Sequence, residues 1–273
     1  MSKFVILCNQ PRYIDESEQI YFKENNIPIY RHRTEIPPRF HVPYLVIPRI
    51  FNSQHYAELE CDVKNLGSKL LNDFYSHSFI AKFWYYRCIS HLTFESYHSN
   101  DSAWMKMEGP YVVKGATNSR KLNFKELMYA ENRRAAIDLV GRLGEDPVLF
   151  HQGLIIRKYH KLKTLQEGLN GLDFTNEFRF FCYKDQILSG AFYWEISDVE
   201  PMPPPPEARE LVQRVCECVK GKVDYFVVDV AELDQPDPRL GKWAVVELND
   251  AQMSGLSYNK PEDVYGSLSK LLP

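Results

Sequence analysis

Long apolar runs are absent from this sequence. No uninterrupted hydrophobic stretch approaches the roughly 20 residues that a helix needs to cross a bilayer. The apolar N-terminal stretch Lys3–Cys8 is shorter than the hydrophobic core of a signal peptide. We therefore expect a soluble, cytoplasmic protein with no membrane partner.

Cysteines in metal-binding or disulfide patterns are also missing. The six cysteines are scattered through apolar or mixed segments, where a small buried thiol is ordinary. Cys216 and Cys218 form a Cys-x-Cys pair, but no second pair follows at the spacing of a zinc finger. A zinc site would need distant ligands, so a structural role is favoured for these cysteines.

An excess of positive charge is lacking as well. The chain has 33 Lys and Arg against 36 Asp and Glu, which gives a formal net charge of −3. Such a chain has no global attraction for nucleic acid, although local basic patches stay open. Nucleic acid is therefore an unfavoured partner that the sequence does not exclude.

Several common catalytic motifs do not occur. The sequence contains no Gly-x-Ser-x-Gly elbow, no His-x-x-x-His pair and no Walker loop ending in Gly-Lys-Ser/Thr. Nucleophilic hydrolases and P-loop nucleotidases are therefore disfavoured, and the histidines favour structural roles.

What the sequence has is enough apolar content for a sizeable core, 44% of 273 residues. Near the N-terminus, Lys3–Cys8 and Tyr44–Pro48 have the pattern of buried strands, with a helix predicted over Glu16–Glu24 between them. A further helix is predicted near Ile80–Leu92. The order strand, helix, strand indicates a small α/β lobe.

Secondary structure changes character in the middle of the chain. A strand over Tyr111–Lys114 ends in the polar loop Gly115–Lys121, and Asn123 is predicted to cap one helix that runs to Gly144. Helical spacing of apolar residues supports this helix, at Phe124, Leu127, Met128, Ala135, Leu139 and Leu143.

The second half of the chain favours a mostly antiparallel sheet. Strands are predicted over Leu154–Leu162, Glu177–Tyr183 and Ile187–Trp194, the last two joined by the turn Lys184-Asp185. The proline-rich segment 201–206 is expected to be an extended linker, because proline lacks the backbone donor. A helix with an apolar face follows it and ends near Gly221.

A hairpin near the C-terminus brings oxygen-bearing side chains together. Its predicted strands, Tyr225–Val230 and Trp243–Asn249, place Asp229 on one strand face and Glu247 and Asn249 on the neighbouring one. Carboxylate and amide oxygens suit Mg²⁺, which is often shared with substrate phosphates. The alternative is a pair of solvated strand ends with turn-forming Asp and Asn.

The loop after Lys114 offers groups that suit polyphosphate. Gly115 permits close backbone approach, and hydroxyls and positive charges follow on Thr117, Ser119, Arg120 and Lys121. A simple polar turn is an equally good interpretation from spacing alone.

Two arginines lie inside predicted strands, where burying a guanidinium is costly unless it meets an anion. Arg179 shares a strand face with Glu177, so a structural salt bridge is one explanation. A substrate phosphate or Glu177 could satisfy either arginine, and a purely structural role is harder to give to Arg157.

These segments, taken in order, resemble the ATP-grasp superfamily, and more closely its largely uncharacterised clade named for two arginines and a lysine. The resemblance covers nearly the whole chain. Its segments are Ala57–Glu60, Pro110–Gly115, Thr117–Lys121, Ile155–Tyr159, Asn176–Phe181, Val227–Ala231, Val246–Asp250 and Gln252–Leu256.

The resemblance implies an α+β fold in which antiparallel sheets of two lobes enclose ATP, preceded by a small α/β pre-ATP-grasp lobe. It implies an N-terminal lobe over residues 1–100 and a catalytic region over residues 101–273. ATP and Mg²⁺ are the implied cofactors, with Mg²⁺ held by Asp229, Glu247 and Asn249.

The resemblance also implies roles for individual residues. Lys114, Arg157 and Arg179 are the implied catalytic residues, and the arginines stabilise phosphoryl charge. The basic pair Arg157-Lys158 departs from the acidic segment that many members carry there, and Lys82 and Lys106 compete for the usual first phosphate lysine. The nucleotide-binding residues are Lys114, Thr117, Asn118, Ser119, Arg120 and Lys121, with Gln152 and Ile155 at the adenine hinge.

The implied activity is that of an ATP-dependent ligase that phosphorylates a carboxylate to an acylphosphate, which an amine or other nucleophile attacks. The acceptor is a small molecule, a peptide or a protein tail. Residues 250–256 line the acceptor site or form an ordinary turn. Other ATP chemistry, such as phosphoryl transfer or nucleic-acid end joining, and a nucleotide-binding module without turnover are the alternatives.

Overall fold

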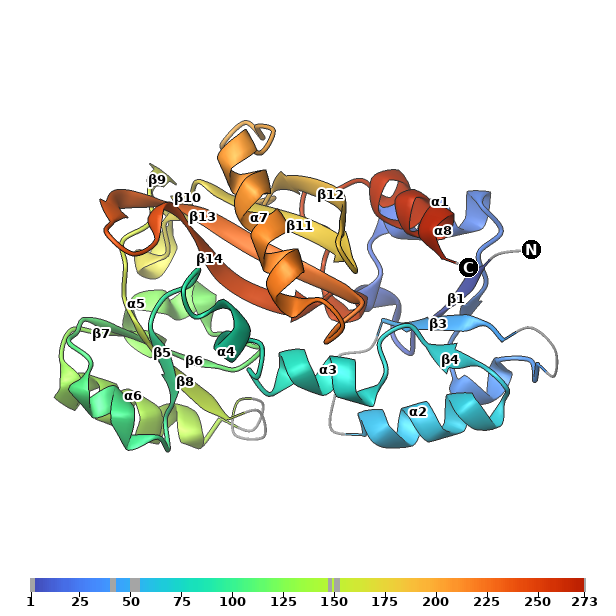
Figure 1. Cartoon of the computed structure of the whole chain (residues 1–273), viewed down its shortest axis with the longest axis horizontal. Helices are drawn as coiled ribbons and strands as arrows, with labels where there is room; N and C mark the ends of the chain where they lie inside the picture. The colour runs from blue at the N-terminus through green and yellow to red at the C-terminus, as the bar shows by residue number, and fades with distance from the viewer. Residues whose placement is uncertain (1–2, 40–42, 50–54, 147–148, 150–152, 273) are drawn as a thin grey trace.

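The computed structural model of the chain describes residues 3–39, 43–49, 55–146, 149 and 153–272. Within these residues the chain forms a parallel N-terminal sheet, an antiparallel middle sheet and an antiparallel C-terminal sheet. In Figure 1 the N-terminal sheet lies on the right, and the C-terminal sheet lies above the middle sheet on the left.

The N-terminal sheet is built from short parallel strands whose residues are mostly buried. Parallel neighbours need crossover connections, which α1 (Glu16–Glu24) and α2 (Tyr56–Asn65) supply. The predicted α/β lobe is confirmed, with α2 and two further strands added. The strand order is β2 (Ile29–Tyr30), β1 (Phe4–Leu7), β3 (Leu45–Pro48) and β4 (Lys69–Leu70).

The middle sheet carries the loop predicted to bind phosphate. Helix α6 (Arg133–Gly144) packs on it through Ala136, Leu139 and Leu143. Because β5 belongs to this sheet, the sheet begins before residue 100, where the sequence predicts the domain boundary. The strand order is β5 (Ser96–His98), β8 (Leu154–Lys158), β6 (Tyr111–Gly115) and β7 (Tyr129–Ala130).

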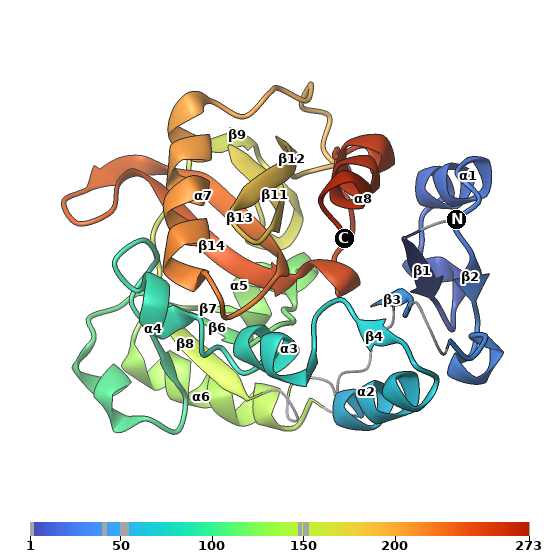
Figure 2. The same cartoon turned by 45° about the vertical axis from the view of Figure 1, so that its right-hand side comes forward.

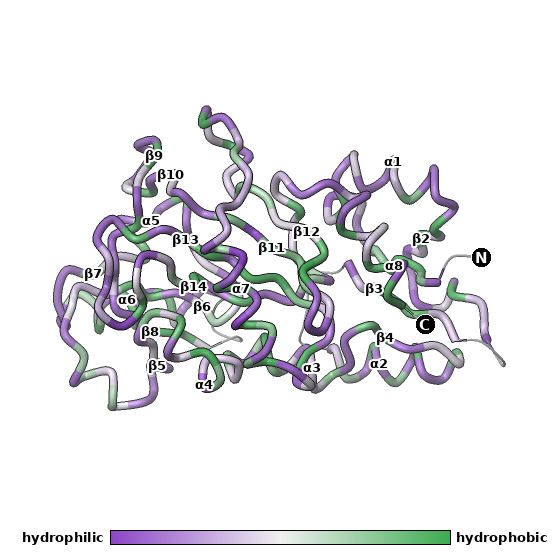
Figure 3. The backbone as a smooth tube through the Cα atoms, turned by 45° about the horizontal axis from the view of Figure 1, so that its top comes forward, coloured by the Kyte–Doolittle hydropathy of each residue, from purple (hydrophilic) through white to green (hydrophobic). Residues whose placement is uncertain are grey.

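The C-terminal sheet forms the largest part of the core. Helix α7 (Pro206–Val219) lies across it in Figure 1 and buries its apolar face there. Figure 3 shows hydrophobic segments along β11 and β12. A separate hairpin, β9 (Thr164–Gln166) and β10 (Phe174–Thr175), precedes this sheet. The strand order is β12 (Gln186–Phe192), β11 (Glu177–Tyr183), β13 (Tyr225–Asp237) and β14 (Gly241–Asp250).

The end of the chain returns to its beginning. A π-helical turn, Glu262–Gly266, leads into α8 (Ser267–Leu271), and Tyr265 and Leu268 share a core with Phe4. Figure 2 shows α8 next to α1. The N-terminal lobe is therefore held to the C-terminal sheet by apolar packing. Among the described residues, none of the helices combines the length and apolarity that crossing a bilayer requires.

The helix predicted near Ile80–Leu92 is wrong in its extent. The chain forms α3 (Phe74–Ala81) and the single turn α4 (Tyr86–Ile89), separated by Phe83, whose φ is +61°. Phe83 is buried in the same core as the C-terminal sheet. The apolar periodicity therefore reflects burial of aromatic side chains on a bent segment, which spacing does not distinguish from a helix.

The single helix predicted from Asn123 to Gly144 is also wrong. Helix α5 (Phe124–Leu127) ends before β7, and α6 begins only after Asn132, whose side chain accepts a hydrogen bond from the Ala135 amide at 3.1 Å. Met128 and Ala130 are buried at strand β7 and beside it. Met128 keeps helical spacing with Phe124 and Leu127, although its carbonyl accepts a hydrogen bond from the Val113 amide of β6.

The predicted C-terminal hairpin is confirmed and is longer than expected. Residues of β13 and β14 pair antiparallel from Phe226 opposite Asp250 to Asp237 opposite Gly241. The strand predicted over Leu154–Leu162 ends at Lys158, and the proline-rich segment leads into α7 as expected.

A buried ion pair joins the N-terminal lobe to the C-terminal segment. Arg49 donates from one amino group to Glu18 at 3.0 Å and from the other to the backbone carbonyls of Gln252 and Ser254. Tyr265 donates a hydrogen bond to the second oxygen of Glu18. Burial raises the pKa of Glu18 even though Arg49 opposes this shift.

We predict that Arg49→Met lowers the free energy of unfolding by about 3 kcal/mol, because it leaves the Glu18 carboxylate buried without a cation. Urea unfolding at neutral pH measures the change. The matched control is Arg33→Met, which removes the half-exposed pair with Asp62 and should cost less than about 1 kcal/mol. Equal losses in the two variants would contradict the prediction.

Candidate functional site

Two neighbouring cavities lie between the loop after β6 and the C-terminal sheet. The larger cavity has a volume of about 550 Å³, and its walls include the loop 117–123, the end of β14 and residues 253–255. The smaller cavity, about 150 Å³, lies between the middle and C-terminal sheets. Both share Ser119, Lys121 and Glu247 as lining residues.

The hairpin of β13 and β14 places the three predicted metal ligands side by side. Asp229 pairs with Glu247 across the strands, and Val227 pairs with Asn249. The Asn249 amide lies 3.5 Å from the Asp229 carboxylate. Glu247 and Asn249 line the larger cavity, while Asp229 is fully buried beneath it.

Lys114 connects the middle sheet to the C-terminal sheet. Its Nζ atom, near the end of β6, donates a hydrogen bond to the Glu247 carboxylate of β14, and both side chains are buried. Burial lowers the pKa of Lys114, and Glu247 opposes that shift. Burial also acts to raise the pKa of Glu247, but Lys114 and Lys121 outweigh it and hold that pKa well below its usual range.

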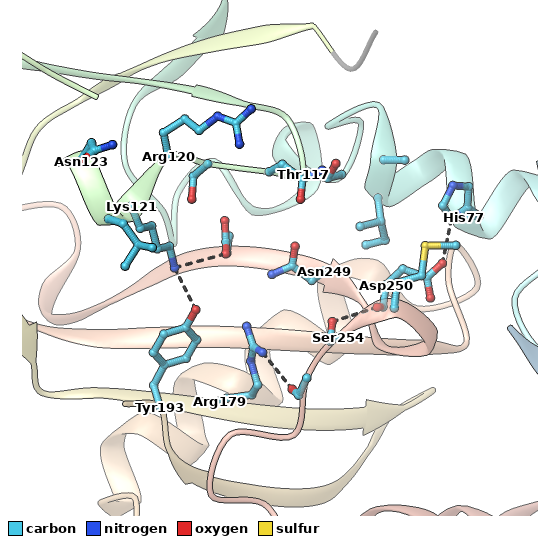
Figure 4. A pocket seen from close by; sticks show the side chains of 18 residues that line it. His77, Thr117, Arg120, Lys121, Asn123, Arg179, Tyr193, Asn249, Asp250 and Ser254 are labelled. Atoms are coloured by element: carbon cyan, nitrogen blue, oxygen red, sulfur yellow. Dashed lines mark hydrogen bonds and ion pairs between the residues drawn. The ribbon is translucent and has the colours of Figure 1, made fainter. Parts of the chain in front are cut away.

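Lys121, at the end of the predicted phosphate loop, extends toward the C-terminal sheet. Its Nζ donates to the Tyr193 hydroxyl at 2.9 Å and lies 3.9 Å from Glu247 (Figure 4). Burial acts to lower the pKa of Lys121, but Tyr193 and Glu247 raise it above its ordinary value. Lys121 is therefore a cation held by Tyr193 and Glu247 from the side of the C-terminal sheet.

Arg179 forms a bidentate ion pair with Asp229. Its Nε and one amino group donate to the two carboxylate oxygens at 2.9 and 2.8 Å, and the other amino group donates to the Gly255 carbonyl at 2.9 Å. Arg179 therefore pairs with Asp229 and not with Glu177, the partner that the sequence suggested for a structural salt bridge. Arg179 lines the larger cavity, together with Tyr193 (Figure 4).

Arg157 lies in the wall of the smaller cavity. Its Nε donates to the Ser96 hydroxyl at 2.9 Å, and one amino group donates to the Val246 carbonyl. The other amino group is buried and makes no hydrogen bond of full geometry within the described part of the chain. Burial raises the pKa of the Tyr85 hydroxyl, which lies near enough to Arg157 for the guanidinium to oppose that shift. A buried guanidinium nitrogen without an acceptor is costly, so an anionic ligand there would satisfy it.

The remaining residues of the predicted phosphate loop line the larger cavity from above. Thr117, Asn118, Ser119 and Arg120 all belong to its wall. Arg120 Nε donates to Asp146 at 2.7 Å, and Figure 4 shows its guanidinium turned away from the centre of the cavity. The structure thus brings the loop and the acidic hairpin to one site.

The predicted adenine hinge does not lie at either cavity as far as it is described. Gln152 lies outside the described residues. Ile155 is fully buried in the core, opposite Lys114 and His98 in the sheet, and is absent from the described walls of both cavities. The chain instead crosses between the sheets after β8, where Tyr159, His160 and Leu162 line the smaller cavity.

Glu177 is a further polar group of the smaller cavity. One carboxyl oxygen accepts from Thr175 at 3.3 Å, and the other is buried without a partner in the described residues. Burial raises the pKa of Glu177 to about 7. Cations outnumber carboxylates in the described walls of the two cavities, which carry Lys114, Arg120, Lys121, Arg157, Lys158, Lys161 and Arg179 against Asp173, Glu177, Glu247 and Asp250.

The donor set at the hairpin suits a metal that also binds ligand oxygens. Across the described ranges, no group of three or more His, Cys, Asp and Glu side chains is close enough to hold a metal ion alone. Asp229 and Glu247 supply carboxylates and Asn249 an amide oxygen. Mg²⁺ commonly completes such a partial set with phosphates and water.

Sequence reasoning missed His77 and Tyr193, which both line the larger cavity. Tyr193 lies just beyond the end of β12, and His77 lies in α3, 173 residues from its partner Asp250. No local spacing signals such contacts. Asp250, Ser254 and Gly255 also line the cavity, within the segment predicted to form an acceptor site or a turn.

Solved structures with the same fold are ATP-grasp proteins. A RimK domain protein from Sphaerobacter thermophilus DSM 20745 has a TM-score of 0.62 and 12% identity, and 98% of each chain is covered. D-alanine–D-alanine ligase from Bacillus anthracis, complexed with ATP, has a TM-score of 0.59 and 14% identity, with 99% of each chain covered.

A third similar structure is the ATP-grasp ligase PsnB complexed with a minimal precursor, Mg and ADP. Its TM-score is 0.59 at 13% identity, with 100% of this chain and 97% of that chain covered. At these identities the likeness shows the fold alone. No curated protein matches the chain in sequence.

A family profile matches residues 101–268 of the 273, which is more than half of the chain. The profile describes an ATP-grasp domain, family 3 of the clade named for two arginines and a lysine. It spans β6, β11, β13 and β14, so it includes Lys114, Arg179 and the acidic hairpin. The chain therefore has the ATP-grasp fold and belongs to family 3 of that clade of ATP-grasp domains.

Proposed function

We propose that the protein is an ATP- and Mg²⁺-dependent ligase that joins a carboxylate to an amine or another nucleophile. The contact that carries this proposal is the ion pair between Lys114 and Glu247. This ion pair brings the phosphate loop of the middle sheet to the acidic hairpin of the C-terminal sheet. The larger cavity beside it has room for the substrates that react with ATP. The proposed catalytic region is residues 101–273, after an N-terminal lobe of residues 1–100 whose last strand, β5, joins the middle sheet of the catalytic region.

The smaller cavity suits the base and ribose of ATP. Its apolar walls come from both sheets and from the crossing segment, and Glu177 offers an unpaired oxygen to a ligand hydroxyl. Since the cavity shares Ser119 and Lys121 with the larger one, a bound nucleotide would direct its phosphates toward that junction. The crossing segment, rather than Ile155, is therefore our candidate for contacts to adenine.

The junction of the cavities suits the phosphates. The Lys and Arg side chains that line the two cavities outnumber the Asp and Glu side chains there, so an added polyanion is favoured. Arg157 has a nitrogen ready for a phosphate oxygen. Backbone and hydroxyl groups of Thr117, Asn118, Ser119 and Arg120 would supply neutral donors.

Asp229, Glu247 and Asn249 would hold Mg²⁺ between protein and phosphates. The ion, when bound, neutralises phosphate charge and so makes transfer of the terminal phosphoryl group easier. The relatives fit this proposal: the Bacillus anthracis ligase was solved with ATP, and PsnB with Mg and ADP.

The proposed reaction has two steps. A substrate carboxylate oxygen attacks the terminal phosphorus, which releases ADP and leaves an acylphosphate. A nucleophile then attacks the acyl carbon, the carbon–oxygen bond to phosphate breaks, and phosphate leaves. Lys114, Arg157 and Arg179 stabilise the negative charge that moves during both steps. The expected acceptors stay a small molecule, a peptide or a protein tail, and the PsnB structure solved with a precursor peptide supports the peptide among them.

Product analysis tests the reaction class. We predict that the productive pair from a panel of carboxylates and amines, with ATP and Mg²⁺, yields ADP, phosphate and ligated product in equal amounts. Hydroxylamine in place of the amine should yield a hydroxamate, because it traps acylphosphates. A matched Lys114→Met preparation serves as the inactive control. AMP and pyrophosphate as products would contradict the acylphosphate mechanism, and a phosphorylated acceptor would indicate kinase-like transfer instead.

Glu177 makes a pH dependence of stability measurable without substrate. Its folded-state pKa of about 7 lies above the ordinary 4.5, so the folded protein binds more protons than the unfolded chain between these values. Stability therefore falls as pH rises across that window. Glu177→Gln removes the effect and should be about 3 kcal/mol more stable relative to wild type at pH 8 than at pH 4.

Urea unfolding of both proteins at the two pH values measures this difference. The control is Glu131→Gln, which changes an exposed carboxyl. The same pH dependence in wild type and Glu177→Gln would show that the buried carboxyl carries no such penalty.

A further inference from the structure

The larger cavity has an end that the phosphate chemistry does not use. His77, Ile80 and Ala81 of α3 line it, together with Met253 and Asp250 (Figure 4). His77 has only 4% of its surface exposed. A buried imidazole at the wall of a substrate cavity is a candidate for proton transfer, provided that one ring nitrogen is free.

One ring nitrogen of His77 is fixed by Asp250. His77 Nδ1 lies 2.8 Å from one carboxylate oxygen. Asn72 Nδ2 and the backbone N–H of Gln252 donate to the other oxygen at 2.9 and 3.0 Å. A carboxylate that already accepts these donors acts as an acceptor toward His77 too. Nδ1 therefore carries the proton and donates it.

The other ring nitrogen of His77 is unpaired. Nε2 is buried and has no hydrogen-bond partner among the residues that the structure describes. A protonated Nε2 would be a buried N–H without an acceptor on a charged ring, whereas the neutral ring leaves only a lone pair unused. The geometry therefore favours a neutral imidazole whose Nε2 can accept a proton.

The ring is held rigidly in this orientation. Tyr56 stacks on His77 with ring centroids 4.0 Å apart and planes 8° from parallel. The Tyr56 hydroxyl accepts from Gln252 Nε2 at 2.8 Å and donates to the Asn72 carbonyl at 2.6 Å. A base whose orientation is fixed by a carboxylate and by packing is the arrangement that general-base catalysis requires.

We propose that this end of the larger cavity binds the amine acceptor and that His77 is its general base. The inference rests on the ligase function proposed above. The amine nitrogen bonds to the acyl carbon of the acylphosphate, the bond from that carbon to the phosphate oxygen breaks, and phosphate leaves with the bonding electrons. The proton lost by the nitrogen goes to His77 Nε2.

The wall beside His77 indicates the class of amine. Ile80, Ala81 and Met253 supply apolar surface next to the imidazole, and the Ser254 hydroxyl is already used by the Asp250 carbonyl at 2.9 Å. An acceptor that presents a primary amine next to a short apolar group fits this combination. A strongly anionic acceptor would be repelled by the Asp250 carboxylate in the same wall.

Nitrogen NMR of histidine-labelled full-length protein tests this assignment without knowledge of the natural acceptor. His77 is identified by the loss of its signals in His77→Gln or, should that variant not fold, by through-space contacts to Tyr56. With saturating ADP and Mg²⁺, we expect Nδ1 protonated and Nε2 unprotonated at neutral pH. Titration with n-propylamine should shift the Nε2 resonance, while tetramethylammonium, which has no N–H, should not.

A protonated Nε2, or an Nε2 resonance that n-propylamine does not move, would overturn the proposal. A histidine that merely holds α3 to the C-terminal segment would keep the Nδ1 contact and show no response to the amine. Calorimetric titration of the same preparation with ATP separates failure of the proposed ligase function from failure of the role proposed for His77. Absence of ATP binding refutes the ligase itself, whereas ATP binding with an unresponsive His77 refutes only the role of this residue.

Discussion

The buried ion pair between Lys114 and Glu247 is the interaction on which the site depends. Burying two charges is expensive, and their attraction rarely exceeds the loss of hydration. A pair of apolar residues would hold the sheets together at lower cost. The pair is therefore better explained by a ligand that uses both groups, the cation for phosphate and the carboxylate for a metal. Tyr193 and Asp229 hold the neighbouring cations Lys121 and Arg179 in the same way.

The N-terminal lobe takes part in the site through the Arg49 side chain, which holds the backbone of the segment after β14. Arg49 donates to the carbonyls of Gln252 and Ser254, and Arg179 of the C-terminal sheet donates to the carbonyl of Gly255. This short segment is thus fixed between two buried guanidinium groups, each paired with its own carboxylate. Its side chains form the wall of the larger cavity near His77. The geometry of the proposed acceptor end is consequently set by the N-terminal lobe and the C-terminal sheet together.

The sequence predicted the features that local alternation and turns determine. Strands β11 and β13, the C-terminal hairpin and the loop after Lys114 follow from such patterns, whereas the pairing of Asp229 with Glu247 comes from the structure. It failed where burial imitates helical spacing, at Phe83 and at the strand β7. Partners far apart in sequence, such as His77 with Asp250, leave no local signal. The bonding of Arg179 to Asp229 rather than Glu177 depends on strand pairing, which one strand alone does not reveal.

Calorimetric titration with ATP, with and without Mg²⁺, tests the central claim most directly. The native chain is compared with a Glu247→Gln, Asn249→Ala double variant and with a control, Glu24→Gln, Asn25→Ala, which changes exposed groups of the same kinds. We expect native and control proteins to bind ATP tightly only with Mg²⁺, and the double variant to lose at least about tenfold in affinity, or about 1.4 kcal/mol. Folded native protein that does not bind ATP, or binding that ignores both Mg²⁺ and the double substitution, would contradict it.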